Sequence, residues 1–499
     1  MDRRTFLGVV GAGVAFSRPR GLAGASSWLR GSNRVTPRLR FPLPLPATVR
    51  ADDLTLVAGP TAVDFGAGQG EAWTINGEMP APTIRLERGE TAQIRLENQL
   101  PESTILHWHG LDVPEQADGH PRLAIDPGEV YEYEFPVQDR AGLYWYHPHP
   151  HGRTAKQTYQ GMAGLLVIED DEERSLELPG ADFEIPLLLQ DKRLGDDPSL
   201  EYAPARMGPD RMYGYLGDTA FGNGMADPTV EVTRGRHRLR ILNGSNARIL
   251  DLGLSTEDAM VLIGTDGGLL ERPVSLPRIM MGTGERADLI VDFSRFQAGD
   301  RIILRSYDFE IPGAMGMGGG GRMGGGMHAM MPAVLQGVAM DFVEFVVTDG
   351  PTWDGPPLPD RLSRIDRPLP SAAQVGEADR VFRFDSAMMR HSINGQPFEM
   401  ARVDATIARG QSEIWSLVNE GPLAHPVHIH AGQFRVVARE GGRARVMPWE
   451  TGLKDTVLVW PGETAHLSVR FDRHPGLFLL HCHNLEHEDA GMMSNFRVE

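Results

Sequence analysis

The chain has 499 residues, of which 41% are hydrophobic and 23% charged, so it has the composition of a globular protein and the length of two to four domains. A formal net charge of −18 argues against nucleic acid as the main partner, because phosphate binding needs a basic face. The single cysteine excludes an intrachain disulfide framework, and the 58 glycines and 37 prolines favour many turns between short strands.

Residues 1–30 are typical of a twin-arginine export signal. Arg3 and Arg4 precede a Thr-Phe-Leu triplet and an apolar run that ends at Phe16. This run is too short to span a bilayer, and no later segment is long and apolar enough to do so. A basic N-terminal tail is the alternative interpretation. We expect twin-arginine export of a folded protein to the periplasm or the exterior, and no membrane span.

Three segments of the chain resemble one another. Each contains Asn-Gly, an alternating strand, Arg-Gly, a second alternating strand and a closing Asn. These segments are residues 75–98, 222–243 and 393–419. A hydrophobic period of two, with turns rich in Gly and Asn, predicts β-strands joined by tight loops.

The repeat predicts an all-β protein of three consecutive β-sandwich domains. The expected boundaries are 45–170 for the first domain, 171–348 for the second and 375–499 for the third. The Pro-rich stretch 349–374 is expected to be the linker into the third domain.

Histidine pairs occupy equivalent positions in the first and third repeats. His107 and His109 lie nine and eleven residues after the closing Asn of the first repeat, and His428 and His430 lie at the same distances in the third. The matching place in the second repeat, in residues 250–254, holds no histidine. We therefore expect a site shared by the first and third domains, with the second domain as a spacer.

The chain holds five His-x-His pairs, where a random chain of this composition would hold about 0.6. They are His107/His109, His147/His149, His149/His151, His428/His430 and His481/His483. Alternate residues of a strand point to the same face, roughly 6.5–7 Å apart, so such pairs can bind two neighbouring metal ions. A single pair is more often a polar strand face, but that reading fits poorly when the pairs recur in two homologous repeats.

The only cysteine, Cys482, lies between His481 and His483. In a strand its side chain points away from both histidines, so it would serve a different metal from theirs. The covalent path through the backbone would then join a site that takes single electrons to a cluster that suits dioxygen, whose reduction to water needs four electrons.

The expected partners of Cys482 are His487 from the following turn and His425 from a distant strand. A thiolate, two imidazoles and a weak axial thioether, which Met492 can supply, form the blue-copper electron-transfer arrangement. Zinc also accepts Cys-His-His, but it is redox-silent and would leave the neighbouring histidine cluster unexplained.

Four motifs carry a resemblance to a known family. They are HWHG (107–110), HPHPHG (147–152), HPVHIH (425–430) and HCHNLEHEDAGMM (481–493). In this order the chain, from about residue 45 onward, resembles the multicopper oxidases, the laccase-like enzymes of three domains. The resemblance implies three cupredoxin-like Greek-key sandwiches and four copper ions.

The resemblance also implies the ligands of each copper. Type 1 copper would be held by His425, Cys482 and His487, with Met492 axial. Type 2 copper would take His107 and His428. The type 3 pair would take His109, His147 and His483 on one ion and His149, His430 and His481 on the other.

Asp118 and Glu488 match positions that deliver protons to reduced oxygen species in this family, and with Cys482 they are the expected catalytic residues. Four protons must reach a buried cluster, and a carboxylate beside a histidine ligand can carry them. The alternative is that both are ordinary loop acids.

A Gly/Met-rich segment, residues 313–332, makes the periplasmic cuprous oxidases a second comparison beside bacterial laccases. Thioethers favour Cu(I), so the segment is a candidate Cu(I)-binding loop, although an inert insertion is the alternative. Its methionines are Met315, Met317, Met323, Met327, Met330 and Met331. Gly421 and Leu423 stand where the cuprous oxidases carry an acid and a methionine, which weakens that comparison.

The expected partners are dioxygen and a small electron donor, either a phenol, an aromatic amine or Cu(I). The protein is expected to be a monomer. A non-enzymatic periplasmic copper-sequestering or scaffold protein is the alternative function. A copper nitrite reductase fits poorly, because that family lacks the histidine pair around the cysteine.

Overall fold

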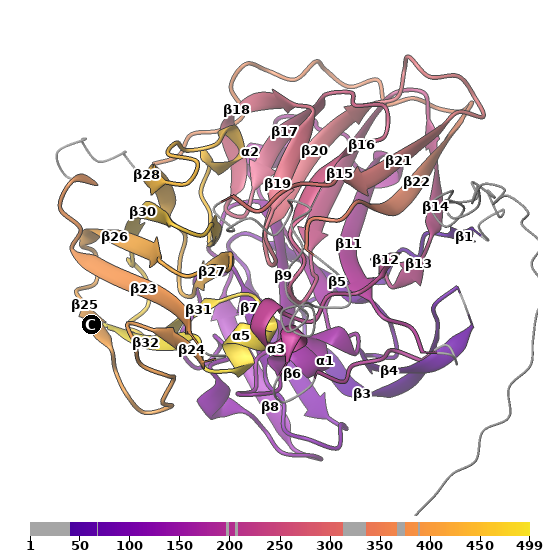
Figure 1. The fold of residues 1–499 in the computed structure, drawn as a ribbon. Coiled ribbons are helices and arrows are strands. Elements are labelled where there is room, and N and C mark those ends of the chain that lie inside the picture. Colours follow the sequence, from indigo (N-terminus) through magenta and orange to yellow (C-terminus); the bar gives the residue numbers. More distant parts are fainter. Residues whose placement is uncertain are drawn as a thin grey trace, which may run out of the picture. The chain divides into compact units, whose positions relative to one another are not determined.

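The computed structural model of the chain describes residues 40–66, 68–195, 199–204, 208–312, 336–366, 375–387 and 390–499 (Figure 1). The predicted export signal and the Met-rich segment 313–332 lie outside the described residues. The described part of the predicted linker, residues 349–366, contains no helix or strand. None of the described helices is long and apolar enough to cross a membrane.

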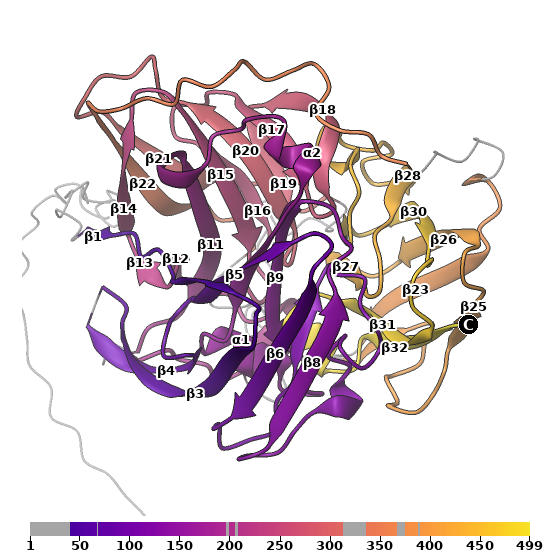
Figure 2. The same ribbon diagram turned by 180° about the vertical axis from the view of Figure 1, so that it is seen from behind.

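A five-stranded and a four-stranded sheet share one core and form the first sandwich. Ile84 from one sheet and Ile94 and Phe135 from the other belong to the same buried cluster. In sheet order, the strands are β2 (Thr48–Arg50), β5 (Ala81–Glu87), β10 (Gly164–Glu169), β9 (Gly142–Pro148) and β7 (Leu106–His109), facing β4 (Gln69–Ile75), β3 (Leu54–Asp64), β6 (Thr91–Asn98) and β8 (Val130–Pro136). Figure 2 shows β6 and β8 side by side.

The middle sandwich consists of a seven-stranded and a six-stranded sheet. Leu239 and Leu289 of the larger sheet pack with Leu252 and Phe345 of the smaller one. The larger sheet has the order β13 (Met225–Ala226), β12 (Thr219–Gly222), β11 (Glu184–Lys192), β15 (Arg236–Asn243), β20 (Arg286–Asp292), β17 (Met260–Thr265) and β18 (Gly268–Leu276). The smaller has the order β1 (Phe41–Pro42), β14 (Pro228–Thr233), β22 (Met340–Thr348), β21 (Arg301–Ser306), β16 (Leu250–Leu254) and β19 (Arg278–Met281).

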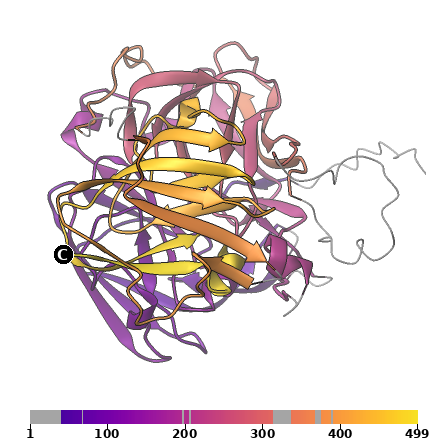
Figure 3. The ribbon, with the colours of Figure 1, turned by 60° about the vertical axis from the view of Figure 1, so that its left-hand side comes forward.

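Two five-stranded sheets form the third sandwich, which is drawn in orange and yellow in Figure 3. Trp415 and Leu467 of one sheet share a core with Val427 and Phe478 of the other. The first sheet has the order β24 (Arg390–Ile393), β23 (Arg380–Ala387), β26 (Ser412–Asn419), β30 (Glu463–Arg470) and β28 (Arg435–Gly441). The second has the order β25 (Ala405–Ile407), β32 (Met493–Val498), β31 (Gly476–Cys482), β27 (His425–Ile429) and β29 (Thr456–Val459).

The α-helices of the described chain are short, and three of them lie next to the motif segments. Helix α5 packs against both α1 and α3 (Figure 1). Helix α1 follows β9, and α5 follows β31, so each comes directly after a histidine-rich strand. The helices are α1 (Thr154–Tyr159), α2 (Asp171–Arg174), α3 (Pro209–Tyr213) and α5 (Leu485–Asp489), and the 3-10 helices are Pro121–Leu123, Ala181–Phe183 and Pro448–Glu450.

The strand registers bring the motifs together. His107 on β7 pairs with His147 on β9, and His428 on β27 pairs with His481 on β31. Period-two alternation explains why outer strands such as β6 form, since successive residues of TAQIRLEN are exposed and buried in turn. The strands that carry the motifs are buried throughout, which is typical of strands covered on both faces.

Candidate metal centres

His425, Cys482 and His487 form a buried group of three potential ligands. Nδ1 of His425 lies 3.4 Å from Sγ of Cys482, and Nδ1 of His487 lies 3.7 Å from the same sulfur. The two Nδ1 atoms are 3.3 Å apart. Three soft or borderline donors therefore converge on one point, in the geometry that a single metal ion needs.

Met492 lies in the same buried core cluster as Cys482. Its backbone is bonded to both ligand segments, because Cys482 N donates to Met492 O at 3.0 Å and Met492 N donates to His487 O at 2.9 Å. Asn484 N donates to Sγ of Cys482 at 3.4 Å. Burial raises the pKa of the Cys482 thiol well above its ordinary value, so the thiolate needs a metal as counter-charge.

Two neighbours of His487 had no signal in the sequence. The ring of His391 stacks on the ring of His487, with centroids 4.1 Å apart. Nε2 of His487 donates to Met212 O, on α3 of the middle sandwich, at 2.8 Å. This bond directs Nδ1 of His487 towards the sulfur, and it places the backbone of α3 against the outer edge of the ring.

Eight other histidines form a second, larger cluster beside the first. All are at most 1% exposed, and they come from β7, β9, β27, β31 and the residues just after these strands. Their ligand atoms form overlapping groups of three. The groups are His107/His109/His428, His109/His147/His483 and His149/His430/His481.

Several imidazoles of the cluster face one another with the same ring nitrogen. Nε2 of His107 lies 3.3 Å from Nε2 of His428, and Nε2 of His481 lies 3.1 Å from Nε2 of His430 and 3.4 Å from Nε2 of His149. Nitrogens that face one another at these distances suit a shared metal ion better than hydrogen bonds between the rings.

The outward nitrogens of the rings bind protein oxygens. Nδ1 of His107 donates to Asp118 O at 2.6 Å, Nδ1 of His428 to Asp455 O at 2.9 Å, and Nδ1 of His147 to Pro148 O at 2.9 Å. A ring that donates from one nitrogen leaves the other as a bare lone pair. This assigns the inward nitrogens as metal-binding atoms.

Some ring nitrogens of the cluster have no hydrogen-bond partner among the described residues, although they are fully buried. They are Nδ1 of His109, Nε2 of His147, Nδ1 of His149 and both ring nitrogens of His483. Unsatisfied buried polar atoms are rare and costly, so a group of them calls for a ligand. Metal ions bound to the groups of three would satisfy Nδ1 of His109 and Nε2 of His147, and the donor set of imidazoles and one thiolate suits copper.

Burial keeps the cluster histidines neutral. It lowers the pKa of His107, His109 and His430 well below the ordinary value and that of His149 to about 4. The neutral imidazole is the form that binds metal, so the apo site is ready to bind without losing protons first.

Comparison with known proteins agrees with this chemistry. Two family models described as multicopper oxidase match residues 58–173 and 368–499. The multicopper oxidase mco of Staphylococcus aureus is 32% identical over 429 residues, which cover 85% of this chain and 83% of that protein. The laccase of Haloferax volcanii is 34% identical over 483 residues, covering 86% of this chain and 78% of that protein. The crystal structure of McoA multicopper oxidase from Aquifex aeolicus matches with a TM-score of 0.79 at 31% identity, covering 92% of this chain and 99% of that one.

The chain belongs to the multicopper oxidase family. It is therefore an oxidoreductase that uses copper and couples the oxidation of a small-molecule donor to the reduction of dioxygen. Its fold is that of the family, three consecutive cupredoxin-like sandwiches, which confirms the predicted fold class.

Asp118 and Glu488 are both buried in this multicopper oxidase, and both contact cluster histidines. Oδ2 of Asp118 accepts from Nδ1 of His430 at 2.8 Å. Oε2 of Glu488 lies 3.1 Å from Nδ1 of His481. Burial raises the pKa of Asp118 well above its ordinary value. Neither residue is a surface acid.

The middle sandwich of the multicopper oxidase contributes no histidine to these groups among the described residues, but it contacts them. Thr283 Oγ1 donates to His483 O at 2.5 Å. A Cβ atom on Gly284 would lie 3.1 Å from Cε1 of His109 and 3.1 Å from Cδ2 of His483. The sandwich predicted as a spacer therefore forms one wall of the cluster.

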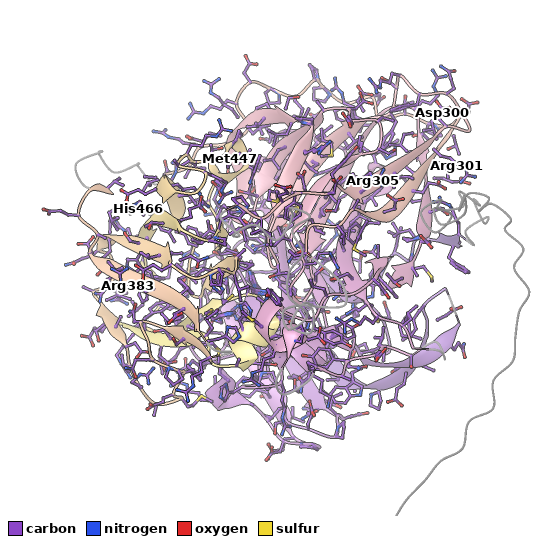
Figure 4. The ribbon with its side chains drawn as sticks, in the orientation of Figure 1. Asp300, Arg301, Arg305, Arg383, Met447 and His466 are labelled. Carbon is purple, nitrogen blue, oxygen red and sulfur yellow. The ribbon has the colours of Figure 1, made fainter. Side chains whose placement is uncertain are left out.

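His466 is a buried histidine that lies outside both groups of potential ligands. It lies on β30, in the sheet away from β27 and β31 (Figure 4), where its Nδ1 and the hydroxyl of Ser416 are 2.8 Å apart. A hydrogen bond within the sheet accounts for this side chain, and no potential metal ligand lies beside it in the groups found among the described residues.

Proposed function

We propose that this multicopper oxidase binds four copper ions, one in the group that contains Cys482 and three in the histidine cluster. His425, Cys482, His487 and Met492 would hold type 1 copper, and His107 and His428 would hold type 2 copper. The type 3 ions are held by His109, His147 and His483 and by His149, His430 and His481. The convergence of bare, buried ring nitrogens on shared points supports this assignment.

Copper bound in these sites supplies one-electron redox chemistry at the mononuclear centre and reduction of dioxygen at the cluster. The chain itself connects the two centres, because Cys482 lies in one and its sequence neighbours His481 and His483 lie in the other. The burial of all these side chains keeps bulk water away from both centres.

Asp118 and Glu488 are proposed to supply protons to the cluster. Oδ1 of Asp118 has no hydrogen-bond partner among the described residues, while Oδ2 is held by His430. This leaves one oxygen of the carboxyl available to hold a proton. Glu488 lies beside His481, which belongs to the same group of three as His430.

The proposed donor is a phenol or an aromatic amine, as the name laccase of the Haloferax volcanii relative suggests. Cu(I) is a second candidate. The residues just before the Met-rich segment support this candidate, because they lie near the proposed type 1 site. Phe309 and Ile311 pack with Ala424 against the cluster that contains Trp460, and Ala424 directly precedes His425. The donor would be settled by oxidation rates for the three donor classes, with and without residues 313–332.

The proposed organisation follows the sequence boundaries 45–170, 171–348 and 375–499, with the linker over 349–374. The pairing of sheets into three cores supports it. Export to the periplasm or exterior by the twin-arginine route rests on Arg3, Arg4 and the apolar run that follows them.

Copper content and the absorption spectrum test the proposal. We expect about four copper ions per chain and an intense blue band from charge transfer between the thiolate and copper. Oxygen uptake with a phenolic donor separates an oxidase from a copper-sequestering or scaffold protein. A chain that binds one copper ion or none would contradict the proposal.

A further inference from the structure

Arg286, at the start of β20 in the middle sandwich, is fully buried and uses every hydrogen that it can donate. Its Nε donates to Leu143 O at 3.1 Å. Its Nη1 donates to Gly284 O at 3.0 Å and to Oδ1 of Asp455 at 2.7 Å. Its Nη2 donates to Asp266 O at 2.9 Å and to Oδ2 of Asp455 at 2.5 Å. A guanidinium has five N–H donors, and here all five are satisfied.

These partners belong to all three sandwiches. Leu143 lies on β9 of the first sandwich, Gly284 and Asp266 lie in the middle one, and Asp455 directly precedes β29 of the third. One side chain thus joins the three units at the place where the cluster is built. The bidentate pair with Asp455 fixes the carboxylate plane as well as its distance.

Asp455 in turn holds two histidines of the cluster. Its Oδ1 accepts from Nε2 of His109 at 3.0 Å, and its main-chain oxygen accepts from Nδ1 of His428 at 2.9 Å. The hydroxyl of the next residue, Thr456, lies 3.1 Å from Nε2 of His109. Arg286 therefore reaches the cluster through one residue that touches a first-sandwich ligand and a third-sandwich ligand.

His109 depends on this contact more than its neighbours do. His107, His147 and His428 are oriented by main-chain oxygens that bind Nδ1 and leave Nε2 bare. His109 is turned the other way, with Nε2 bonded to Asp455 and Nδ1 in the group formed with His147 and His483. The carboxylate selects the tautomer in which Nδ1 is the bare nitrogen.

The backbone is shaped around the ion pair. A Cβ atom on Gly110 would lie 2.4 Å from Oδ2 of Asp455 and 2.6 Å from Nη2 of Arg286, and Gly110 has φ +93°. The glycine of the HWHG motif is therefore the residue that lets the pair approach the end of β7, next to His109. Without it, either the strand or the ion pair would have to move.

We propose that Arg286 and Asp455 are positioning residues that set the ring orientation and tautomer of His109, so that the middle sandwich organises a copper cluster for which none of its described residues is a ligand. The inference rests on the proposed function, because it concerns the same cluster. Lysine cannot replace Arg286, since it has three donors and no planar fork to hold a carboxylate in one plane.

The test compares Arg286→Lys and Asp455→Asn with the unaltered protein in the full chain. We expect the affinity for cluster copper to fall about 10- to 100-fold, as for other losses of a residue that orients a metal ligand. The blue band of the Cys482 centre should remain. Copper affinity is measured by competition with a chelator, and the electron paramagnetic resonance spectrum should show signal from a type 3 pair that is no longer coupled.

Arg238→Lys is the matched control. Arg238 is a buried arginine on β15, the strand next to β20, and it pairs with Asp288 without touching the cluster. This substitution should lower the thermal midpoint of the copper-free protein and leave the affinity for cluster copper unchanged. If Arg238→Lys lowered cluster copper equally, the effect of Arg286→Lys would be a loss of general stability and the proposal would be wrong.

Thr456→Val provides a second test if the charged variants do not fold. It removes one of the two oxygens that receive Nε2 of His109 and keeps both charges. We expect a smaller loss of cluster copper in the same direction. Unchanged affinity and an unchanged resonance spectrum in the folded variants would overturn the inference alone, whereas an unaltered protein that binds one copper ion or none would overturn the proposed function.

Discussion

Cys482 connects the two centres because its side chain and its backbone serve different ones. Its sulfur lies 3.4 Å from Nδ1 of His425. Nε2 of His481, the preceding residue, lies 3.1 Å from Nε2 of His430. The alternation of β31 separates the two faces, and the peptide bond keeps them one residue apart. A metal-bound thiolate at this position would therefore link the two proposed copper centres through the backbone of β31.

Replacing Cys482 with serine should remove the blue band and turnover while most of the cluster copper remains. A hydroxyl is a poor ligand for copper beside two imidazoles, so the mononuclear centre is lost or strongly weakened. The absorption spectrum, copper per chain and oxygen uptake give the three readings. A blue band that persisted in Cys482→Ser would show that the sulfur is not the ligand.

Glu486 and Glu488 lie two residues apart on α5 and face different neighbours. Glu488 lies beside His481 in the cluster. Glu486 faces away, where it accepts from Tyr215 N at 2.9 Å and from Nδ2 of Asn246 at 2.8 Å. The first is the proposed proton donor, and the second holds α5 against the middle sandwich.

Glu488→Gln should lower kcat about 100-fold and leave copper content unchanged, because the amide keeps the shape of the side chain but cannot release a proton. Glu486→Gln is the control on the same helix, and it should keep kcat while lowering the thermal midpoint. Steady-state oxygen uptake and copper analysis distinguish them. Equal loss of turnover in the two variants would mean that Glu488 has no special part in proton supply.

At the scale of elements, α1 and α5 form a bridge between the two ligand-bearing sandwiches. Helix α1 begins five residues after His149, and its own N-cap residue, Arg153, makes no side-chain cap bond. The cap comes from α5, because the carboxylate of Asp489 accepts from Thr154 N and Ala155 N, each at 3.0 Å. A capping contact therefore also fixes the distance between two ligand segments.

Asp489→Ala should destabilise the copper-free protein by about 1 kcal/mol, the usual cost of a lost N-cap, and should also weaken cluster copper binding. Asp170→Ala offers a comparison, since Asp170 caps α2 through Glu173 N at 2.8 Å, away from the ligands. Urea unfolding measures stability, and chelator competition measures copper affinity. The bridge has no role in the cluster if both variants lose stability and neither loses copper affinity.

For the molecule as a whole, the sequence allowed the prediction of the repeated units and of the histidine- and cysteine-rich motifs, but not of contacts between residues outside them. Period-two strands and equal spacings after Asn98 and Asn419 led to the sandwiches and to the histidine pairs. Asp455 and Arg286 stand in no motif and are 169 residues apart in the sequence, and they meet only because the middle and third sandwiches pack together. Their contact depends on tertiary packing, which local patterns do not encode.

A second buried ion network joins the first and middle sandwiches. Arg240 on β15 donates to Glu173 on α2 at 2.7 Å and to Glu184 on β11 at 2.8 Å, and Arg238 donates to Glu173 at 2.9 Å. Arg85, on β5 of the first sandwich, also pairs with Glu184. Buried charges of this kind hold two units in one relative position only while the carboxylates stay ionised.

The network predicts how stability depends on pH. Burial raises the pKa of Glu173 and Glu184, but Arg240 and Arg238 outweigh burial and lower each pKa to about 2, below the ordinary value of 4.5. The unfolded chain therefore binds more protons in this window, and the stabilisation that is present above about pH 4.5 is lost as the pH falls towards 2.

The thermal midpoint of the copper-free protein should accordingly fall as the pH is lowered from about 5 to about 2. Copper-free protein is used because copper binding has a pH dependence of its own. Glu184→Gln should begin at a lower midpoint, since it leaves Arg240 and Arg85 short of a counter-charge, and should then change less with pH. Parallel curves for the two proteins would mean that Glu184 has the same pKa in the folded and the unfolded chain. The acid sensitivity would then arise elsewhere in the chain.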